Sequence, residues 1–342
     1  MRSVTSIFIL SVLAVSFSAA FAIGAPSRPR SDMNKVLNEL LEKEGQPIET
    51  LTAEEARKQP TPTDAVQSIL LREKIKPKSD LASVADTKVQ GAEGMIPVRV
   101  YTPKGKQPLP VVVYFHGGGF VIATNDVYDA TPRALAEQTG AIFISVEYRK
   151  APEHKFPAAH DDAFAAYKWV LRNAASLGGD PKRIAVAGES AGGNLAINVA
   201  IRARDEKVQA PAYQVLVYPV ASNNMNSPSY EENAGAQPLN KPMMEWFVKQ
   251  YLHSPAEAAD PRINLLAANL KELPSATVIT ADIDPLRSEG KELADRLKAA
   301  GVKVEYKNYK GVTHEFFGMA AVVGEAKSAQ KLAAKNLKKA LW

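Results

Sequence analysis

The chain has no cysteine among its 342 residues. This absence excludes disulfide bonds, thiolate metal ligands, a cysteine nucleophile and a lipid-modified cysteine. Histidine is scarce too, with five residues, and no H-E-x-x-H pattern places two of them to hold zinc. The phosphate-binding patterns G-x-G-x-x-G and G-x-x-x-x-G-K-[ST] are missing as well. We therefore expect neither a metal ion nor a cofactor.

A strong excess of one charge is also lacking, since the formal net charge is only +5. The lysine-dense segments 74–78 and 335–339 lie far apart and contain no interleaved aromatic residues. This pattern is typical of a solvated surface, and we expect no nucleic-acid partner. No period of 20–50 residues repeats, which argues against a propeller or solenoid.

One uncharged apolar run is present near the start, over residues 7–21, and it follows a basic start with Arg2. It ends in the small-x-small sequence AFA, which predicts a secretory signal peptide over residues 1–22 with cleavage after Ala22. A membrane anchor is the alternative, but the run is short for a bilayer span. We expect a periplasmic or secreted protein without a stable membrane anchor, and the sequence predicts no oligomeric state.

From about residue 88 onward, short Val/Ile-rich runs alternate with helical stretches, which predicts an α/β fold with a mainly parallel, doubly wound sheet. The expected strands are 111–115, 142–146, 184–187, 213–218, 276–280 and 302–306. The expected helices are 132–138, 161–175, 191–204, 286–300 and a last one ending at residue 341.

Two segments do not follow this alternation. Residues 23–87 combine a Pro-rich leader with a stretch from Asp32 to about Lys58 that has helical periodicity. Residues 223–262 are turn-rich, with a helical patch at 243–252. We expect both segments to form a helical cap over the carboxyl edge of the sheet, where ligands of such sheets bind. The core then consists of residues 88–222 and 263–342.

The sequence Gly188-Glu-Ser-Ala-Gly192 lies between an expected strand and an expected helix. A sharp turn in this position needs small residues two places on either side of Ser190 and presents its hydroxyl as a nucleophile. About 0.07 such G-x-S-x-G matches are expected by chance in a chain of this composition. A plain glycine-rich turn is the alternative interpretation.

A second glycine-rich segment, His116-Gly-Gly-Gly-Phe120, follows the strand predicted at 111–115. Acyl transfer needs backbone N–H donors that are held ready for an oxyanion. In this arrangement the donors come from the glycine loop and from Ala191, the residue after the nucleophile.

A serine nucleophile needs a base and an acid that orients the base. In this strand order the acid and then the histidine follow the serine, which favours His314 among the five histidines. We expect His154 and His160 to be buried structural or capping residues and His253 to face solvent. For the acid, Asp282 and Asp284 compete, and the residues alone favour Asp284 only slightly.

Together these segments resemble the hormone-sensitive-lipase family of α/β-hydrolase esterases, also described as GDXG-type lipolytic enzymes. The matching stretches are HGGGF (116–120), YRKAPEHKFPAAHDD (148–162), DPKRIAVAGESAGGNLA (180–196), DPLRSEG (284–290) and GVTHEFF (311–317). They occur in the family's order and span most of the chain.

The resemblance implies a nucleophile at Ser190, an acid at Asp284 and a base at His314. It implies oxyanion donors at Gly118, Gly119 and Ala191, a helical cap, and no cofactor. The acid of the family stands directly before Pro-Leu-Arg, which selects Asp284 over Asp282. Two departures from the family pattern are Glu189 before the serine and Ser288 after Pro-Leu-Arg.

The function predicted from these residues is a serine carboxylesterase acting on small-molecule esters with short to medium acyl chains. One alternative is a non-catalytic binding protein on the same fold. A further alternative is a peptidase or amidase that uses the same three residues.

Overall fold

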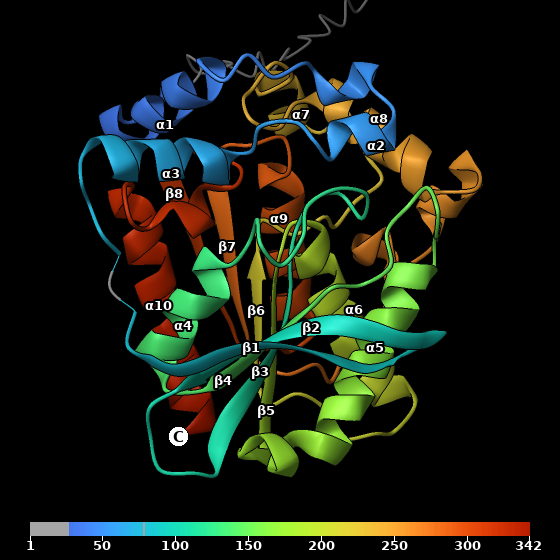
Figure 1. Ribbon diagram of the computed structural model, residues 1–342. Coiled ribbons are helices and arrows are strands. Elements are labelled where there is room, and N and C mark those ends of the chain that lie inside the picture. The colour runs from blue at the N-terminus through green and yellow to red at the C-terminus, as the bar shows by residue number, and fades with distance from the viewer. Residues whose placement is uncertain (1–26, 78) are drawn as a thin grey trace, which may run out of the picture.

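The computed structural model describes residues 27–77 and 79–342, so the predicted signal peptide lies outside the described residues. An eight-stranded sheet with the order β1-β2-β4-β3-β5-β6-β7-β8 forms the centre of the fold (Figure 1). The strands are β1 (Leu81–Gly91), β2 (Gly94–Pro103), β3 (Leu109–Phe115), β4 (Ile142–Val146), β5 (Gly179–Glu189), β6 (Gln214–Val217), β7 (Ala276–Ile283) and β8 (Val304–Thr313). Strand β2 is antiparallel to β1 and β4. The other six strands, β3 to β8, run parallel to one another. The predicted α/β fold with a mainly parallel sheet is confirmed.

Helices cover both faces of this sheet, as the continuous Val/Ile runs predicted. Val111, Val113 and Phe115 of β3 share one apolar core with helices α5 (Ala158–Asn173), α6 (Ala191–Asp205) and α9 (Arg287–Ala299). Val112 and Tyr114 share the other core with α4 (Ala130–Thr139) and α10 (Gly324–Leu341). Side chains of a strand alternate between faces, so both faces must be apolar when both are covered.

The segment from Asp32 to Lys58, for which helical periodicity was predicted, forms several short helices rather than one continuous helix. Helix α1 (Ser31–Leu41) is followed by a turn in which Glu44 has a φ of +53°, a left-handed conformation that does not continue a helix. The chain continues through a short 3-10 helix, η1 (Ile48–Thr50), and helices α2 (Ala53–Ala56) and α3 (Pro62–Arg72). Strand β1 begins at Leu81, so the core boundary that the sequence suggested at residue 88 falls inside a strand.

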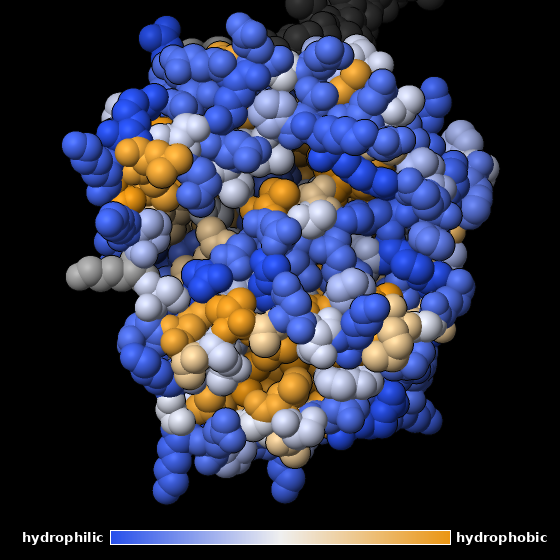
Figure 2. Space-filling model, viewed as in Figure 1, coloured by the Kyte–Doolittle hydropathy of each residue, from blue (hydrophilic) through white to orange (hydrophobic). Residues whose placement is uncertain are grey.

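Helices of the two segments predicted as a cap lie together above the carboxyl edge of the sheet (Figure 1). The later segment contains α7 (Pro228–Glu232), α8 (Lys241–Tyr251) and η3 (Pro255–Ala259), followed by η4 (Leu265–Ala267). The indole N–H of Trp246 on α8 donates to the Leu51 carbonyl at 3.1 Å, which joins the two segments. On the face in Figure 2 the cap presents a mostly hydrophilic surface. No helix among the described residues is long and apolar enough to cross a membrane.

A buried ion pair fixes the antiparallel edge of the sheet to α5. Asp162 is fully buried and accepts from the Arg149 guanidinium at 2.8 and 3.1 Å. It also accepts from the backbone N–H of Ala92, in the turn between β1 and β2, at 2.9 Å. Removing one partner of such a pair leaves the other charge buried without compensation.

We predict that Asp162→Ala lowers the free energy of unfolding by about 3 kcal/mol, measured by urea denaturation. The neighbouring Asp161 pairs with Arg202 at 2.8 Å, but its side chain is 37% exposed. The control Asp161→Ala is therefore expected to lose at most about 1 kcal/mol. Equal losses in the two variants would contradict this account of the buried pair.

Candidate active site

The turn after β5 carries Ser190 in a strained backbone conformation. Its φ is 57° and its ψ is −120°, and its N–H donates to the Val217 carbonyl at 2.9 Å. A Cβ on Gly188 would lie 2.1 Å from the carbonyl oxygen of Gly192. A Cβ on Gly192 would lie 2.0 Å from the carbonyl oxygen of Phe115. Backbone occupies the space of both side chains, so only glycine fits on either side of this serine.

Ser190, His314 and Asp284 form one hydrogen-bonded chain. His314 Nε2 lies 3.0 Å from Ser190 Oγ, and His314 Nδ1 lies 2.7 Å from Asp284 Oδ2. All three side chains are at most 5% exposed. The carboxyl ends of β5, β7 and β8 meet at one edge of the parallel sheet, and this edge brings together residues that are far apart in the sequence.

Asp282, the competing acid, makes different contacts. Its Oδ1 accepts from Lys310 Nζ at 2.8 Å, and its Oδ2 accepts from the Gly311 N–H at 3.4 Å. Burial raises the pKa of Asp282, but the Lys310 and Gly311 donors outweigh burial and hold the pKa below its usual value. Asp284 also accepts from the Leu286 N–H at 2.9 Å, so its carboxylate stabilises the turn that precedes α9 while it contacts His314.

Several carboxylates surround the His314 ring. Burial lowers the pKa of His314, but the charge and hydrogen bond of Asp284, together with Glu315 and Glu189, raise it above its usual value. Glu189 lies beneath the serine turn, where it accepts from the hydroxyls of Tyr114, at 2.6 Å, and Tyr218. Burial raises the pKa of Glu189 to about 7, although both hydroxyls oppose the shift.

The glycine loop after β3 faces the same cavity as the serine. Gly118 and Gly119 have φ values of +98° and +59°, and within the described chain their N–H groups donate no hydrogen bond. Ala191 is the first residue of α6, where a helix has free N–H groups. The structure thus places the three predicted oxyanion amides on two segments at the sheet edge, the glycine loop and the α6 N-terminus.

The other histidines support the surroundings or face solvent. His160 is buried and lies 2.8 Å from the Tyr251 hydroxyl and 2.9 Å from Asn194 Oδ1, as expected of a structural residue. His116 is buried and stacks on Tyr148 with 4.5 Å between ring centroids. His253 is exposed as predicted, whereas His154 is also exposed and the prediction that it is buried was wrong.

A cavity of about 310 Å³ opens onto Ser190 and His314 below the cap. Its apolar wall comes from both cap segments, chiefly from Leu40, Leu41, Ile48, Leu239, Met243, Met244 and Phe247. A second apolar cavity of about 100 Å³ shares Gly119, Val220, Met244 and Phe247 with the first. The sequence reasoning identified these segments as a cap but not the residues that line the cavity.

Two further site residues were missed from the sequence. The ring of Tyr218 packs against His314 with 4.4 Å between centroids, and Glu315 Oε1 lies 3.9 Å from His314 Nε2. Their positions offered a signal, since Tyr218 is the last residue of a predicted strand and Glu315 directly follows the predicted base.

A mainly parallel sheet with helices on both faces, and a serine turn, an aspartate and a histidine at the ends of β5, β7 and β8, define the class of α/β hydrolases. A family model described as alpha/beta hydrolase fold matches residues 112–318. The chain belongs to this family, and its resemblance to the hormone-sensitive-lipase esterases is confirmed.

Curated relatives and solved structures support the same assignment. The chain is 43% identical over 259 residues to carboxylesterase NlhH of Mycobacterium tuberculosis, covering 73% of this chain and 81% of that protein. It is 35% identical over 287 residues to ethyl acetate hydrolase of Pseudomonas putida, covering 82% and 88%. The hyperthermophilic esterase from Pyrobaculum calidifontis matches with a TM-score of 0.83 and 38% identity over 91% of this chain and 98% of that one.

We predict that Asp284→Asn lowers kcat/KM about 10⁴-fold, because His314 loses the acceptor that fixes its tautomer. The activity that remains should also extend to lower pH. Asp284 raises the pKa of His314, and only the neutral imidazole accepts the serine proton, so removing this charge moves the acid limb downward. The pH profile of kcat/KM on a chromogenic ester measures both effects.

The matched control for this prediction is Asp282→Asn, which removes a charge two residues away and leaves the His314 contact in place. Its kcat/KM should stay within about tenfold of the wild-type value. A large loss in Asp282→Asn together with near-normal activity in Asp284→Asn would make Asp282 the orienting acid.

Proposed function

We propose that the protein hydrolyses carboxylic esters of small molecules through Ser190, His314 and Asp284. The hydrogen-bonded chain of these residues at the base of a capped, apolar cavity is the observation that carries this proposal. The protein is an ester hydrolase, as the names of its relatives at 35–43% identity indicate.

The geometry supports a two-step reaction. His314 Nε2 takes the proton of Ser190 while the serine oxygen attacks the ester carbonyl, and the amides of Gly118, Gly119 and Ala191 bind the oxyanion. The protonated Nε2 then gives its proton to the leaving alcohol. In the second step Nε2 takes a proton from water, the water oxygen attacks the acyl-serine, and the carboxylic acid leaves as Ser190 regains its proton.

We assign short to medium acyl chains as substrates. The cap closes over the cavity, and Met244 and Phe247 border both the large cavity and the small one of about 100 Å³. A short apolar chain fits such a space, whereas a long chain meets its wall.

We predict that Ser190→Ala lowers the hydrolysis of 4-nitrophenyl butanoate at least about 10⁴-fold, because no acyl-serine can form. In the wild-type protein, kcat/KM should be highest for acyl chains of two to about eight carbons and should fall for longer ones. A series of 4-nitrophenyl esters from acetate to hexadecanoate measures this dependence.

The control Ser176→Ala changes an exposed serine outside the cavity and should leave kcat/KM unchanged. A fluorophosphonate should label the wild-type protein and Ser176→Ala but not Ser190→Ala. A folded wild-type protein that is neither labelled nor active would favour a binding protein. Faster cleavage of a matched anilide than of the ester would favour an amidase.

We also propose that the protein is exported and that residues 1–22 are removed, which the basic start and the AFA site support. Cleavage after Ala22 leaves every helix and strand of the described chain intact, since α1 begins at Ser31. Mass spectrometry of the secreted or periplasmic fraction should find a protein that begins at Ile23. A cytoplasmic protein that retains Met1 would contradict this proposal.

A further inference from the structure

Glu315, the residue after the proposed base, carries a charge that the reaction described above does not use. Its Oε1 lies 3.9 Å from His314 Nε2, the nitrogen that contacts Ser190. The same oxygen accepts from the Tyr128 hydroxyl at 2.5 Å. The side chain is 23% exposed and lines the large cavity.

The backbone at this position does not favour glutamate. Glu315 has a φ of +69°, in the left-handed region that suits glycine. A strained non-glycine residue beside reacting groups is kept where its side chain has a task. One role of this side chain is to accept the hydrogen bond of the Tyr128 hydroxyl. The neutral amide oxygen of a glutamine would accept this bond equally well, so the bond does not explain why the residue is a glutamate.

The cavity leaves this charge uncompensated by any basic side chain. Among the described residues that line it, two are acidic, Glu315 and Glu49, and none is lysine or arginine. Within the described chain, the only cationic group within 4 Å of the Glu315 carboxylate is the His314 ring itself, when it is protonated. Burial raises the pKa of Glu315, while the nearby His314 and the Tyr128 hydroxyl oppose this shift.

The position of the Glu315 carboxylate relative to His314 Nε2 determines which part of a bound ester lies near it. The proton on Nε2 passes to the oxygen of the leaving alcohol, so the alcohol must come within hydrogen-bond distance of Nε2. Glu315 is 3.9 Å from that nitrogen and lines the cavity, so the alcohol side of a bound ester would lie beside its carboxylate.

We propose that Glu315 determines charge specificity, so that the enzyme favours esters of cationic or neutral alcohols and rejects esters of anionic alcohols. This proposal rests on the proposed function of Ser190. Glu49 is expected to contribute less, because it lies on η1 in the cap, whereas Glu315 is 3.9 Å from the reacting nitrogen.

Three acetate esters that differ in the charge of the alcohol test the proposal. The neutral ester is 3,3-dimethylbutyl acetate, and the cationic ester of the same shape is 2-(trimethylammonio)ethyl acetate. The anionic ester is 4-acetoxybutanoate. A pH-stat measures acid release with each of them. In the wild-type protein, kcat/KM for the cationic ester should exceed that for the anionic ester about 100-fold. This ratio should decrease in 0.5 M NaCl, because salt screens the interaction.

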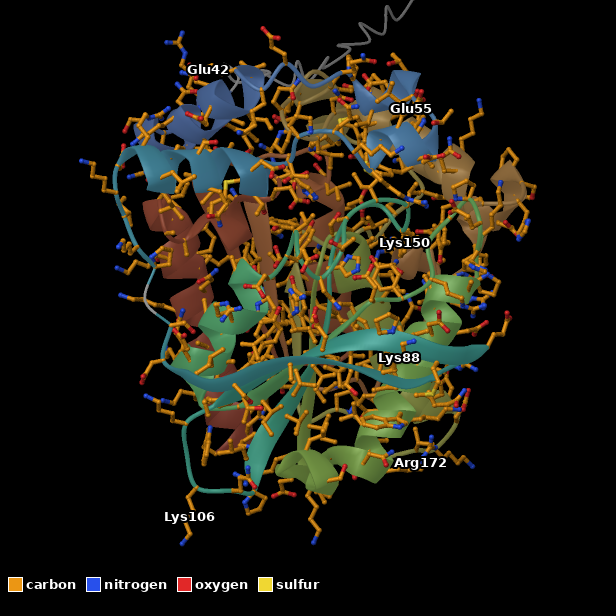
Figure 3. The ribbon with its side chains drawn as sticks, viewed as in Figure 1. Glu42, Glu55, Lys88, Lys106, Lys150 and Arg172 are labelled. Carbon is orange, nitrogen blue, oxygen red and sulfur yellow. The ribbon has the colours of Figure 1, made fainter. Side chains whose placement is uncertain are left out.

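In Glu315→Gln, which keeps an acceptor for Tyr128, the ratio should fall about tenfold or more. Glu49→Gln should change it less, and the control Glu42→Gln, on the outer side of the cap (Figure 3), should not change it. A wild-type ratio near one overturns the proposal. So does a ratio that Glu315→Gln leaves intact or that Glu49→Gln alone abolishes.

If circular dichroism shows that Glu315→Gln is unfolded, the wild-type protein alone tests the proposal, through its ratio of kcat/KM for the cationic and anionic esters and the salt dependence of that ratio. A ratio that salt does not change overturns the proposal. Failure of all three esters together with no fluorophosphonate labelling overturns the proposed function itself, and this proposal with it. Labelling of Ser190 with equal turnover of the three esters overturns only the role of Glu315.

Discussion

The close approach of α6 to the end of β3 is the constraint on which the rest of the site depends. The backbone of Gly192 lies so near the Phe115 carbonyl that no side chain fits between them. This approach places the first turn of α6, with its free N–H groups, next to the glycine loop that follows Phe115. The strained backbone of Ser190 is then a consequence of the packing, and neighbouring strands hold it through the Val217 carbonyl.

Around this turn, carboxylates are buried close to one histidine, His314, and their burial carries a desolvation penalty. Asp284 and Glu189 are buried, and each receives donors from backbone or tyrosine hydroxyl groups. Such donors lower the desolvation penalty of a carboxylate without neutralising it. His314 therefore experiences negative charge from several sides, and this field offsets the effect of burial on its pKa. In the proposed reaction, this arrangement would stabilise the imidazolium that forms when His314 takes the serine proton.

The sequence predicted the central strands well because both of their faces are covered, which leaves unbroken Val/Ile runs. Strands β1 and β2 escaped prediction because β1 is exposed over most of its length and carries residues such as Asp86 and Lys88. The order of Ser190 and His314 along the chain favoured His314 as the base, and the structure places its ring beside the Ser190 hydroxyl. Asp282 and Asp284 could not be separated by spacing, since the choice depends on which carboxylate points at His314 and which meets Lys310.

The cap was predicted as two segments, but its contacts could not be predicted because they join residues 64 to 195 positions apart. Trp246 bonds to Leu51, and Arg57 donates to the carbonyls of Val121 and Ala151, beyond the glycine loop. The cavity roof is thus tied to the loop that carries the proposed oxyanion donors, and Phe247 packs directly on Gly119 of that loop. A substitution in the cap that changes the shape of the cavity therefore also acts on the reacting groups. For the proposed reaction, we therefore expect that a cap substitution which alters acyl-chain selectivity also changes the rate of the chemical step.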